Sequence, residues 1–79
     1  MLILYVKTGC PWCKKVLDAG EELGIKFEEK NIADDAVAAE LIARSGKRQV
    51  PYLVDIERNI KMYESADIDA YLCAQYQKN

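Results

Sequence analysis

The chain opens with an unbroken apolar run at residues 2–6, LILYV, which contains β-branched and aromatic side chains. A run this short and continuous is typical of a buried strand. From Pro11 onward the apolar residues recur at helical spacing as far as Leu23, and Gly24 follows where a left-handed residue commonly ends a helix. This opening segment therefore predicts a strand, a turn and a helix.

The middle of the chain predicts a second strand and a second helix. Residues 26–31 form a more polar stretch bracketed by apolar positions, which indicates a strand partly exposed at the edge of a sheet. Asp34 or Asp35 then caps a helix that ends at Gly46. The apolar positions of this helix are Val37, Ala38, Leu41 and Ile42.

The last third predicts a hairpin followed by a helix. Residues 52–56 and 60–63 straddle a turn in which Asn59 tolerates a positive φ. Ser65 is placed to cap the final helix. The first turn of this helix holds Asp67 and Asp69, and its apolar stripe is Ile68, Tyr71, Leu72 and Tyr76. The order of elements is βαβαββα, an α/β arrangement.

Composition and charge narrow the class of protein. With 79 residues, about half of them apolar, the chain is expected to form one domain over residues 1–79. Its net charge of −2 argues against nucleic acid as a partner. The opening apolar run lacks the basic flank of a secretory signal, and no run is long enough to cross a bilayer. We therefore expect a cytoplasmic monomer with no membrane partner.

The cysteines and the absence of histidine define the available chemistry. Three cysteines are an odd number, unlike the even framework of a disulfide-stapled secreted domain. A tetrahedral zinc site needs four Cys or His ligands, and this chain has one CxxC, a distant Cys73 and no histidine. We therefore expect no metal and no Cys/His catalytic pair.

The segment GCPWC at residues 9–13 places two thiols at the junction of the first strand and helix. Backbone N–H groups and the helix dipole at that point favour a thiolate on Cys10, and Pro11 suits the first helical position. We expect the pKa of Cys10 to lie below the ~8.5 of a free thiol. Cys13, one turn further along, is close enough to form a disulfide and to resolve a bond made by Cys10.

Two simpler interpretations of the cysteine pair were weighed. The cysteines could be small buried apolar residues, or they could form a static disulfide. Neither explains a Pro-Trp pair between them at a strand-to-helix junction, and CxxC beside a βαβ pattern is typical of a redox site. Cys10 is therefore predicted to be the attacking thiol and Cys13 the resolving thiol. Cys73 lies off the apolar stripe of its helix and is predicted to be a bystander.

A second informative position is Pro51, which must start a strand, lie at an edge or occupy a special turn because it cannot donate to a sheet. Taken with the CxxC, the chain resembles the glutaredoxin family of the thioredoxin-like fold over nearly its whole length. The segments that carry the resemblance are residues 7–13, 50–51 and 65–68. The resemblance implies a four-stranded mixed sheet flanked by helices.

The resemblance also implies a glutathione site. In that family the Val-Pro peptide is cis, faces the CxxC and pairs with the cysteinyl residue of glutathione, roles that fall here to Val50 and Pro51. A lysine such as Lys7 and a side chain such as Gln49 lie near the glycine carboxylate of glutathione. The γ-glutamyl end is held by Ser65, Ala66 and Asp67, and Trp12 forms part of the rim.

The chain departs from the glutaredoxin pattern at several positions. Trp12 replaces the usual Tyr or Phe, and Gln49 stands where Thr is common. Tyr63-Glu64 replaces the usual Gly-Gly, and Glu64 with Ser65 instead resembles the N-terminal domain of glutathione transferases. Both kinds of relative bind glutathione at this helix start, so the resemblance still implies a glutathione site there.

These observations predict a glutathione-dependent thiol-disulfide oxidoreductase that acts on disulfide-containing or glutathionylated proteins. One alternative is a redoxin of the same fold reduced by a thioredoxin-reductase-type flavoenzyme. Another is a non-catalytic module that binds glutathione or an iron–sulfur cluster. The fold is also expected to bring several basic residues near Cys10. They are Lys7, Lys14, Lys15, Lys47 and Arg48.

Overall fold

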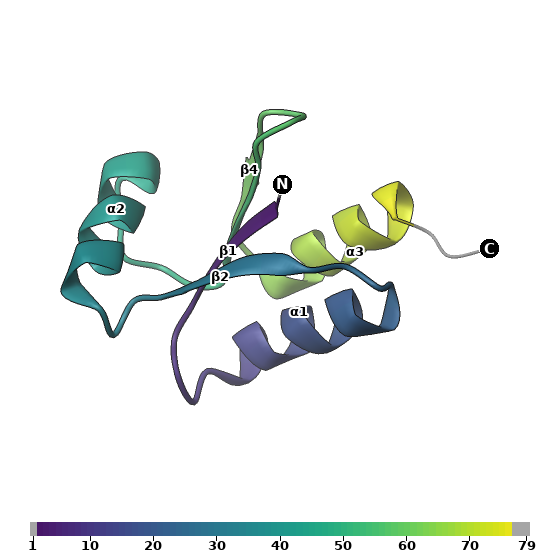
Figure 1. Ribbon diagram of the computed structural model, residues 1–79, viewed down its shortest axis with the longest axis horizontal. Coiled ribbons are helices and arrows are strands. Elements are labelled where there is room, and N and C mark those ends of the chain that lie inside the picture. The colour runs from purple at the N-terminus through teal and green to yellow at the C-terminus, as the bar shows by residue number, and fades with distance from the viewer. Residues whose placement is uncertain (1, 77–79) are drawn as a thin grey trace.

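The computed structural model describes residues 2–76 (Figure 1). The elements in chain order are β1 (Leu2–Val6), α1 (Pro11–Glu22), β2 (Phe27–Asn31), α2 (Asp35–Ser45), β3 (Tyr52–Asp55), β4 (Ile60–Met62) and α3 (Ser65–Gln75). No helix formed by these residues is long and apolar enough to cross a membrane.

The strands form one mixed sheet in the order β2-β1-β3-β4. β1 pairs parallel with β2 and antiparallel with β3, and β4 completes the sheet as the antiparallel neighbour of β3. Helices α1 and α3 lie together on one side of the sheet, and α2 lies on the other side (Figure 1). This is the thioredoxin-like βαβαββα arrangement, so the predicted fold class is confirmed.

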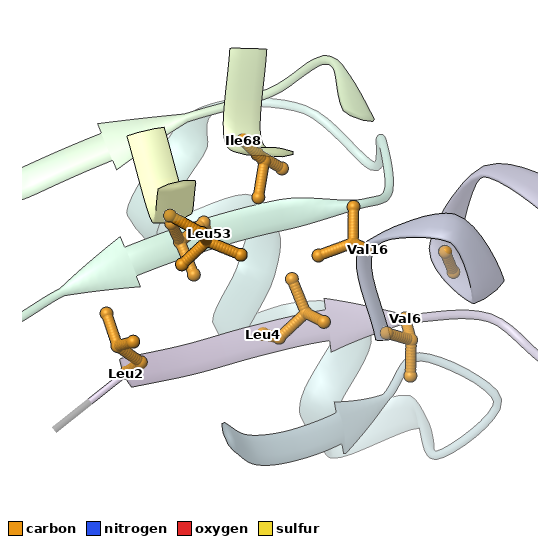
Figure 2. Packing of buried hydrophobic residues seen from close by; sticks show 8 residues of the cluster. Leu2, Leu4, Val6, Val16, Leu53 and Ile68 are labelled. Atoms are coloured by element: carbon orange, nitrogen blue, oxygen red, sulfur yellow. The ribbon is translucent and has the colours of Figure 1, made fainter. Parts of the chain in front are cut away.

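The central strand β1 is buried on both faces, which explains why its sequence is apolar throughout. Leu2, Leu4 and Val6 pack into the core beneath α1 and α3, while Ile3 and Tyr5 pack into the core beneath α2. Figure 2 shows the first of these cores, where side chains from both helices point toward the sheet. Each buried aliphatic side chain of this kind stabilises the fold by about 1.5–3 kcal/mol.

The ends of several elements differ from those predicted. β2 begins at Phe27, one residue later than expected, while β3 ends at Asp55 and β4 at Met62, each one residue earlier. Asp34, one of the two predicted candidates, caps α2, since its side chain accepts a hydrogen bond from the N–H of Ala36 at 2.9 Å.

The prediction that Ser65 caps the last helix is wrong. Ser65 is the first residue of α3, and the capping position belongs to Glu64, whose side chain makes no capping hydrogen bond. Glu64 has a φ of 60°, in the left-handed region that non-glycine residues rarely adopt. The chain therefore enters α3 through a constrained backbone turn instead of through a serine side chain.

A polar cluster ties the end of β3 to α3. Asp55 is fully buried and accepts hydrogen bonds from Tyr71 Oη at 2.6 Å and from Arg58 Nη1 at 3.0 Å. Burial alone would raise the pKa of the Asp55 carboxyl, but these hydrogen bonds and the charge of Arg58 outweigh it and lower that pKa. The cluster therefore depends on Asp55 being ionised.

A second polar cluster joins α2 to the sheet. The hydroxyl of the buried Tyr5 donates a hydrogen bond to Glu40 of α2. Lys30 of β2 forms an ion pair with the same carboxylate at 2.9 Å. Because one α2 side chain contacts two neighbouring strands, the helix is fixed in position along the sheet.

The Asp55 cluster predicts a specific pH dependence of stability. A carboxyl whose folded pKa is depressed stabilises the fold above its unfolded pKa, about 4, and loses that contribution as the pH falls through the folded pKa. Asp55→Asn should lower the free energy of unfolding most at neutral pH, and its difference from the wild type should shrink below pH ~4. Urea unfolding at a series of pH values measures this difference.

Tyr71→Phe provides a second variant for the same measurement. It leaves Asp55 buried with one hydrogen bond fewer, so the unfolding free energy at neutral pH should fall by about 1–3 kcal/mol. A pH-independent difference between wild type and Asp55→Asn would contradict the role assigned to the ionised carboxyl.

Candidate functional site

The thiol of Cys10 lies at the start of α1. Gly9, with a φ of 80°, turns the chain sharply after β1, and Cys10 takes the capping position with extended backbone angles. Pro11 occupies the first helical position, as predicted, where its missing N–H leaves no bond unmade. The sulfur of Cys10 accepts a hydrogen bond from the backbone N–H of Cys13 at 3.4 Å, in the place of a capping oxygen.

The surroundings of Cys10 favour its thiolate. Partial burial would by itself raise the pKa of the Cys10 thiol. Hydrogen bonds from the side chain and backbone of Cys13 and from the backbone of Trp12, together with the charge of Lys7, outweigh burial and lower that pKa. Cys10 thus has the chemical character of a nucleophile although the chain contains no histidine.

Cys13 has the opposite character. Its side chain is buried at 2% exposure against the core beneath α1 and α3. Burial raises the pKa of Cys13 to about 11, and the hydrogen bond that its thiol gives to Cys10 contributes to the rise. Both cysteines carry free thiols, and Cys73 is a free, exposed thiol on α3. Cys13 is therefore the more buried of the two, since Cys10 is only partly buried.

The second part of the site precedes β3. The peptide bond between Val50 and Pro51 is cis, as the family resemblance implied. Pro51 is buried, while Val50 is half-buried and packs against both core clusters. The backbone of this segment is therefore held against the core immediately before β3 begins at Tyr52.

A groove of about 370 Å³ lies between Trp12, two residues after Cys10, and the Val50-Pro51 peptide, and neither Cys10 nor Cys13 is among its lining residues. It is bounded by Trp12 from the start of α1, by the segment that leads into β3 and by the start of α3. The lining residues are Trp12, Gln49, Val50, Pro51, Glu64, Ser65 and Ala66. Six of these seven are predicted glutathione-binding residues.

Two predicted glutathione-binding residues, Lys7 and Asp67, lie outside the lining of the groove. Lys7 is exposed at the end of β1 and acts on the site through its charge near Cys10. Asp67 is exposed in the first turn of α3. Glu64 lines the groove although it was not among the predicted contacts, and a glutamate at a positive φ leaves no local signal in the sequence.

Basic side chains surround part of this groove. Lys15 lies over the ring of the exposed Trp12, with its ammonium 5.1 Å from the ring centroid. Lys47 lies over the ring of Tyr63, with its ammonium 4.6 Å from the centroid. Of the five basic residues predicted to lie near Cys10, Lys7 acts on the Cys10 thiol through its charge, and Lys15 lies over Trp12, which lines the groove.

A larger pocket of about 460 Å³ lies at the far end of α1, where Leu23 and Gly24 line it with Tyr76. It is remote from the thiols, because Cys10 marks the opposite end of the same helix. Within residues 2–76, no three His, Cys, Asp or Glu side chains come together in a way that could hold a metal ion.

Comparison with known families decides the classification. The family described as glutathione S-transferase, N-terminal domain, matches residues 4–79. The chain belongs to this family. It is also 31% identical to a glutaredoxin-like 8.6 kDa protein of the rubredoxin operon of Clostridium pasteurianum, over 70 residues that cover 87% of this chain and 93% of the relative.

Solved structures agree with this assignment. A glutathione S-transferase from the Antarctic clam Laternula elliptica is 29% identical, with a TM-score of 0.81 over 98% of this chain. A delta-class glutathione transferase from Nilaparvata lugens is 28% identical, with a TM-score of 0.82 over the whole chain. The chain spans only 36% and 38% of the length of these two proteins.

The contrast between the two thiols can be measured by alkylation. In a Cys73→Ser background, iodoacetamide should modify Cys10 first. The pH at which this rate reaches half its maximum should lie below ~8.5, the pKa of a free thiol. Cys13 should resist modification until the pH approaches its raised pKa of about 11. Mass spectrometry of peptides after timed quenching separates the two sites.

Lys7→Gln tests one cause of this contrast. Removing the lysine charge should move the alkylation profile of Cys10 to higher pH, because that charge favours the thiolate. Modification of Cys13 before Cys10 in the Cys73→Ser protein would reverse the assignment of the two thiols.

Proposed function

We propose that this protein is a glutathione-dependent thiol-disulfide oxidoreductase that reduces glutathione mixed disulfides and protein disulfides. Its relatives are named glutaredoxin-like and glutathione transferase, which supports a glutathione-related redox or transferase role on this fold. Within that range, the paired cysteines favour redox chemistry.

The observation that carries the proposal is the hydrogen bond from the Cys13 N–H to the Cys10 sulfur at the start of α1, beside a groove bounded by a cis Val50-Pro51 peptide. A sulfur in the capping position is favoured as a thiolate by backbone amides and by the helix dipole. A thiolate beside an open groove can be reached by a disulfide substrate.

The reaction proceeds by thiol-disulfide exchange. The Cys10 thiolate attacks the glutathione sulfur of a mixed disulfide, the substrate protein leaves as a thiol, and a Cys10–glutathione disulfide forms. A second glutathione, as its thiolate, attacks the glutathione sulfur of that disulfide, which yields glutathione disulfide and restores the Cys10 thiolate. Each turnover consumes one free glutathione and converts the mixed disulfide into a protein thiol and glutathione disulfide.

Cys13 offers a second route with protein disulfides. Cys10 forms a mixed disulfide with one substrate sulfur, and Cys13, after losing its proton, attacks Cys10 to release the substrate as a dithiol. The product is a Cys10–Cys13 disulfide, which two glutathione molecules then reduce. The raised pKa of Cys13 limits this route, because the attacking species is the thiolate.

The groove provides a place for glutathione next to Cys10. The Val50 backbone would pair with the cysteinyl residue, and Gln49 would lie toward the glycine end. Ser65 and Ala66 begin α3, and backbone N–H groups at a helix start suit the carboxylate of the γ-glutamyl end. Asp67, exposed in the same turn, would attract the γ-glutamyl ammonium.

The two thiols should differ in their effect on turnover. Cys10→Ser should abolish reduction of a glutathione mixed disulfide, because no thiolate remains at the helix start. Cys13→Ser should keep that activity and lose reduction of a protein disulfide in the dithiol route. The assay couples turnover of a small glutathione mixed disulfide to NADPH oxidation by glutathione reductase.

The same assay design separates the alternatives. Turnover with a thioredoxin-reductase-type flavoenzyme but not with glutathione would favour the reductase-coupled redoxin. Conjugation of glutathione to an aryl halide by wild type and Cys13→Ser, without disulfide reduction, would favour a transferase. A Cys10→Ser protein that retains full activity would exclude the mechanism proposed here.

The charge of Lys7 should affect the use of glutathione. An exposed charge-assisted contact contributes about 0.2–1 kcal/mol, so Lys7→Gln should raise the KM for glutathione by at most about fivefold. The wild-type KM should rise with added salt because screening weakens the contact, and the variant should respond less. Lys26→Gln, an exposed lysine at the far end of α1, is the matched control. Equal salt responses in wild type and Lys7→Gln would show that Lys7 does not contact glutathione.

A further inference from the structure

Two of the segments that line the groove are residues 49–51, before β3, and residues 64–66, after β4. These segments are called the two walls, and both are continuous with paired strands. β3 and β4 pair antiparallel, and the pair nearest the groove is Leu53 with Met62. The pairing ends there, and Pro51 lies two residues before Leu53 while Glu64 lies two residues after Met62, both in the lining of the groove. The β3–β4 pairing therefore brings the starts of the two walls side by side.

Tyr63 follows Met62, the last residue of β4, and precedes Glu64. Its ring packs against Tyr52 with centroids 4.7 Å apart and the ring planes inclined at 43°. Its hydroxyl donates a hydrogen bond to the carbonyl oxygen of Ser45 at 3.2 Å, and the Lys47 ammonium lies 4.6 Å from its ring centroid. The Tyr63 side chain thus contacts both β3 and the turn that leads to Val50 and Pro51.

That turn belongs to neither a helix nor a strand between Ser45 and Tyr52. Gly46 reverses the chain with a φ of 87°, and the Ser45 hydroxyl lies 2.8 Å from the carbonyl oxygens of both Leu41 and Lys47, to which it can donate its one proton in turn. These bonds shape the turn locally. The contacts of Tyr63 come from a different part of the chain, next to the start of α3, so they tie the turn to that helix start.

Tyr63 also constrains the other wall. The residue that follows it, Glu64, has a φ of 60° and lines the groove. A non-glycine residue with a positive φ is strained and persists only where its surroundings hold it. Such residues are found often at ligand-binding sites. Tyr63 directly precedes Glu64, so its three contacts act next to the peptide that enters this conformation.

We propose that Tyr63 is a positioning residue that fixes the spacing of the two walls and thereby sets the affinity of the groove for glutathione. The identity of the ligand rests on the proposed function, whereas the positioning of the walls does not. Tyr63 acts through residues 45–50 and Glu64, and it is absent from the lining of the groove itself.

The test compares three variants. Tyr63→Leu removes the hydroxyl and the ring, while Tyr63→Phe removes only the hydrogen bond to Ser45. The matched control is Tyr76→Leu at the far end of α3, because the Tyr76 hydroxyl also makes one hydrogen bond, accepted from Arg58 at 3.1 Å, and its ring also lies under a cation, 5.5 Å from the Arg58 guanidinium. The control therefore removes similar interactions at a distance from the groove.

Two measurements are made on each protein. Steady-state turnover gives the KM for glutathione and kcat, at a temperature where thermal unfolding shows every variant folded. Hydrogen–deuterium exchange of the backbone amides of residues 46–50, in the protein without ligand, reports how firmly the turn is held.

Tyr63→Leu should raise the KM for glutathione about tenfold, the result of losing the hydrogen bond and the cation–π contact together. The rise for Tyr63→Phe should be smaller, about threefold, because the ring remains. For both, kcat should stay within about twofold of the wild type, since the reacting thiol is untouched. Tyr76→Leu should lower thermal stability but leave the KM unchanged.

Exchange of amides 46–50 should be faster in Tyr63→Leu and unchanged in Tyr76→Leu. A wild-type KM in Tyr63→Leu, or an equal rise in Tyr76→Leu, would overturn the proposal. If the wild-type protein does not use glutathione at all, the proposed function fails instead. The exchange measurement then decides the positioning role alone, and equal exchange in the two leucine variants would refute it.

Discussion

The structure depends on the pairing of β1 with a neighbour on each side and its burial on both faces. β1 ends at Val6, and α1 packs back over the face of β1 that carries Leu4. The connection between them is short, so Cys10 lies at the start of α1. β3 runs antiparallel to β1, and Tyr5 pairs with Tyr52 at this same end. Pro51 therefore lies beside the end of β1 as well, and one strand end places both halves of the site.

Activation of the thiol follows from this placement. The chain has no histidine that could act as a base, so the stabilisation of a Cys10 thiolate comes from backbone amides in the first turn of α1, from Cys13 and from Lys7. The backbone amides and Cys13 are fixed by the helix itself, whereas Lys7 follows the end of β1. The same helix buries Cys13, so a separation of three residues yields two thiols with opposite tendencies to ionise.

The fold and the thiols could be predicted from the sequence because their signals are local. The apolar run of β1, the helical spacing after Pro11 and the CxxC each depend on a few consecutive residues. The cis Val50-Pro51 bond and most of the groove followed only from resemblance to a family, since the sequence pattern alone left several roles open for Pro51. The wrong cap at Ser65 has a different cause. Serine is a good capping residue, but Glu64 takes the capping position with a φ of 60°, a backbone conformation that no local sequence signal favours for glutamate.

The position of Asp55 separates a group that controls the pH dependence of stability from the reactive thiol. Asp55 pairs with Leu2, at the end of the sheet opposite to the thiols, and its cluster with Arg58 and Tyr71 joins β3 to the distal part of α3. The contribution of Asp55 to stability in acid is thus made at one end of the sheet, and the reactive thiol lies at the other. Substitutions that adapt the protein to a more acidic surrounding can accumulate around Asp55 while the helix start at Cys10 keeps its chemistry.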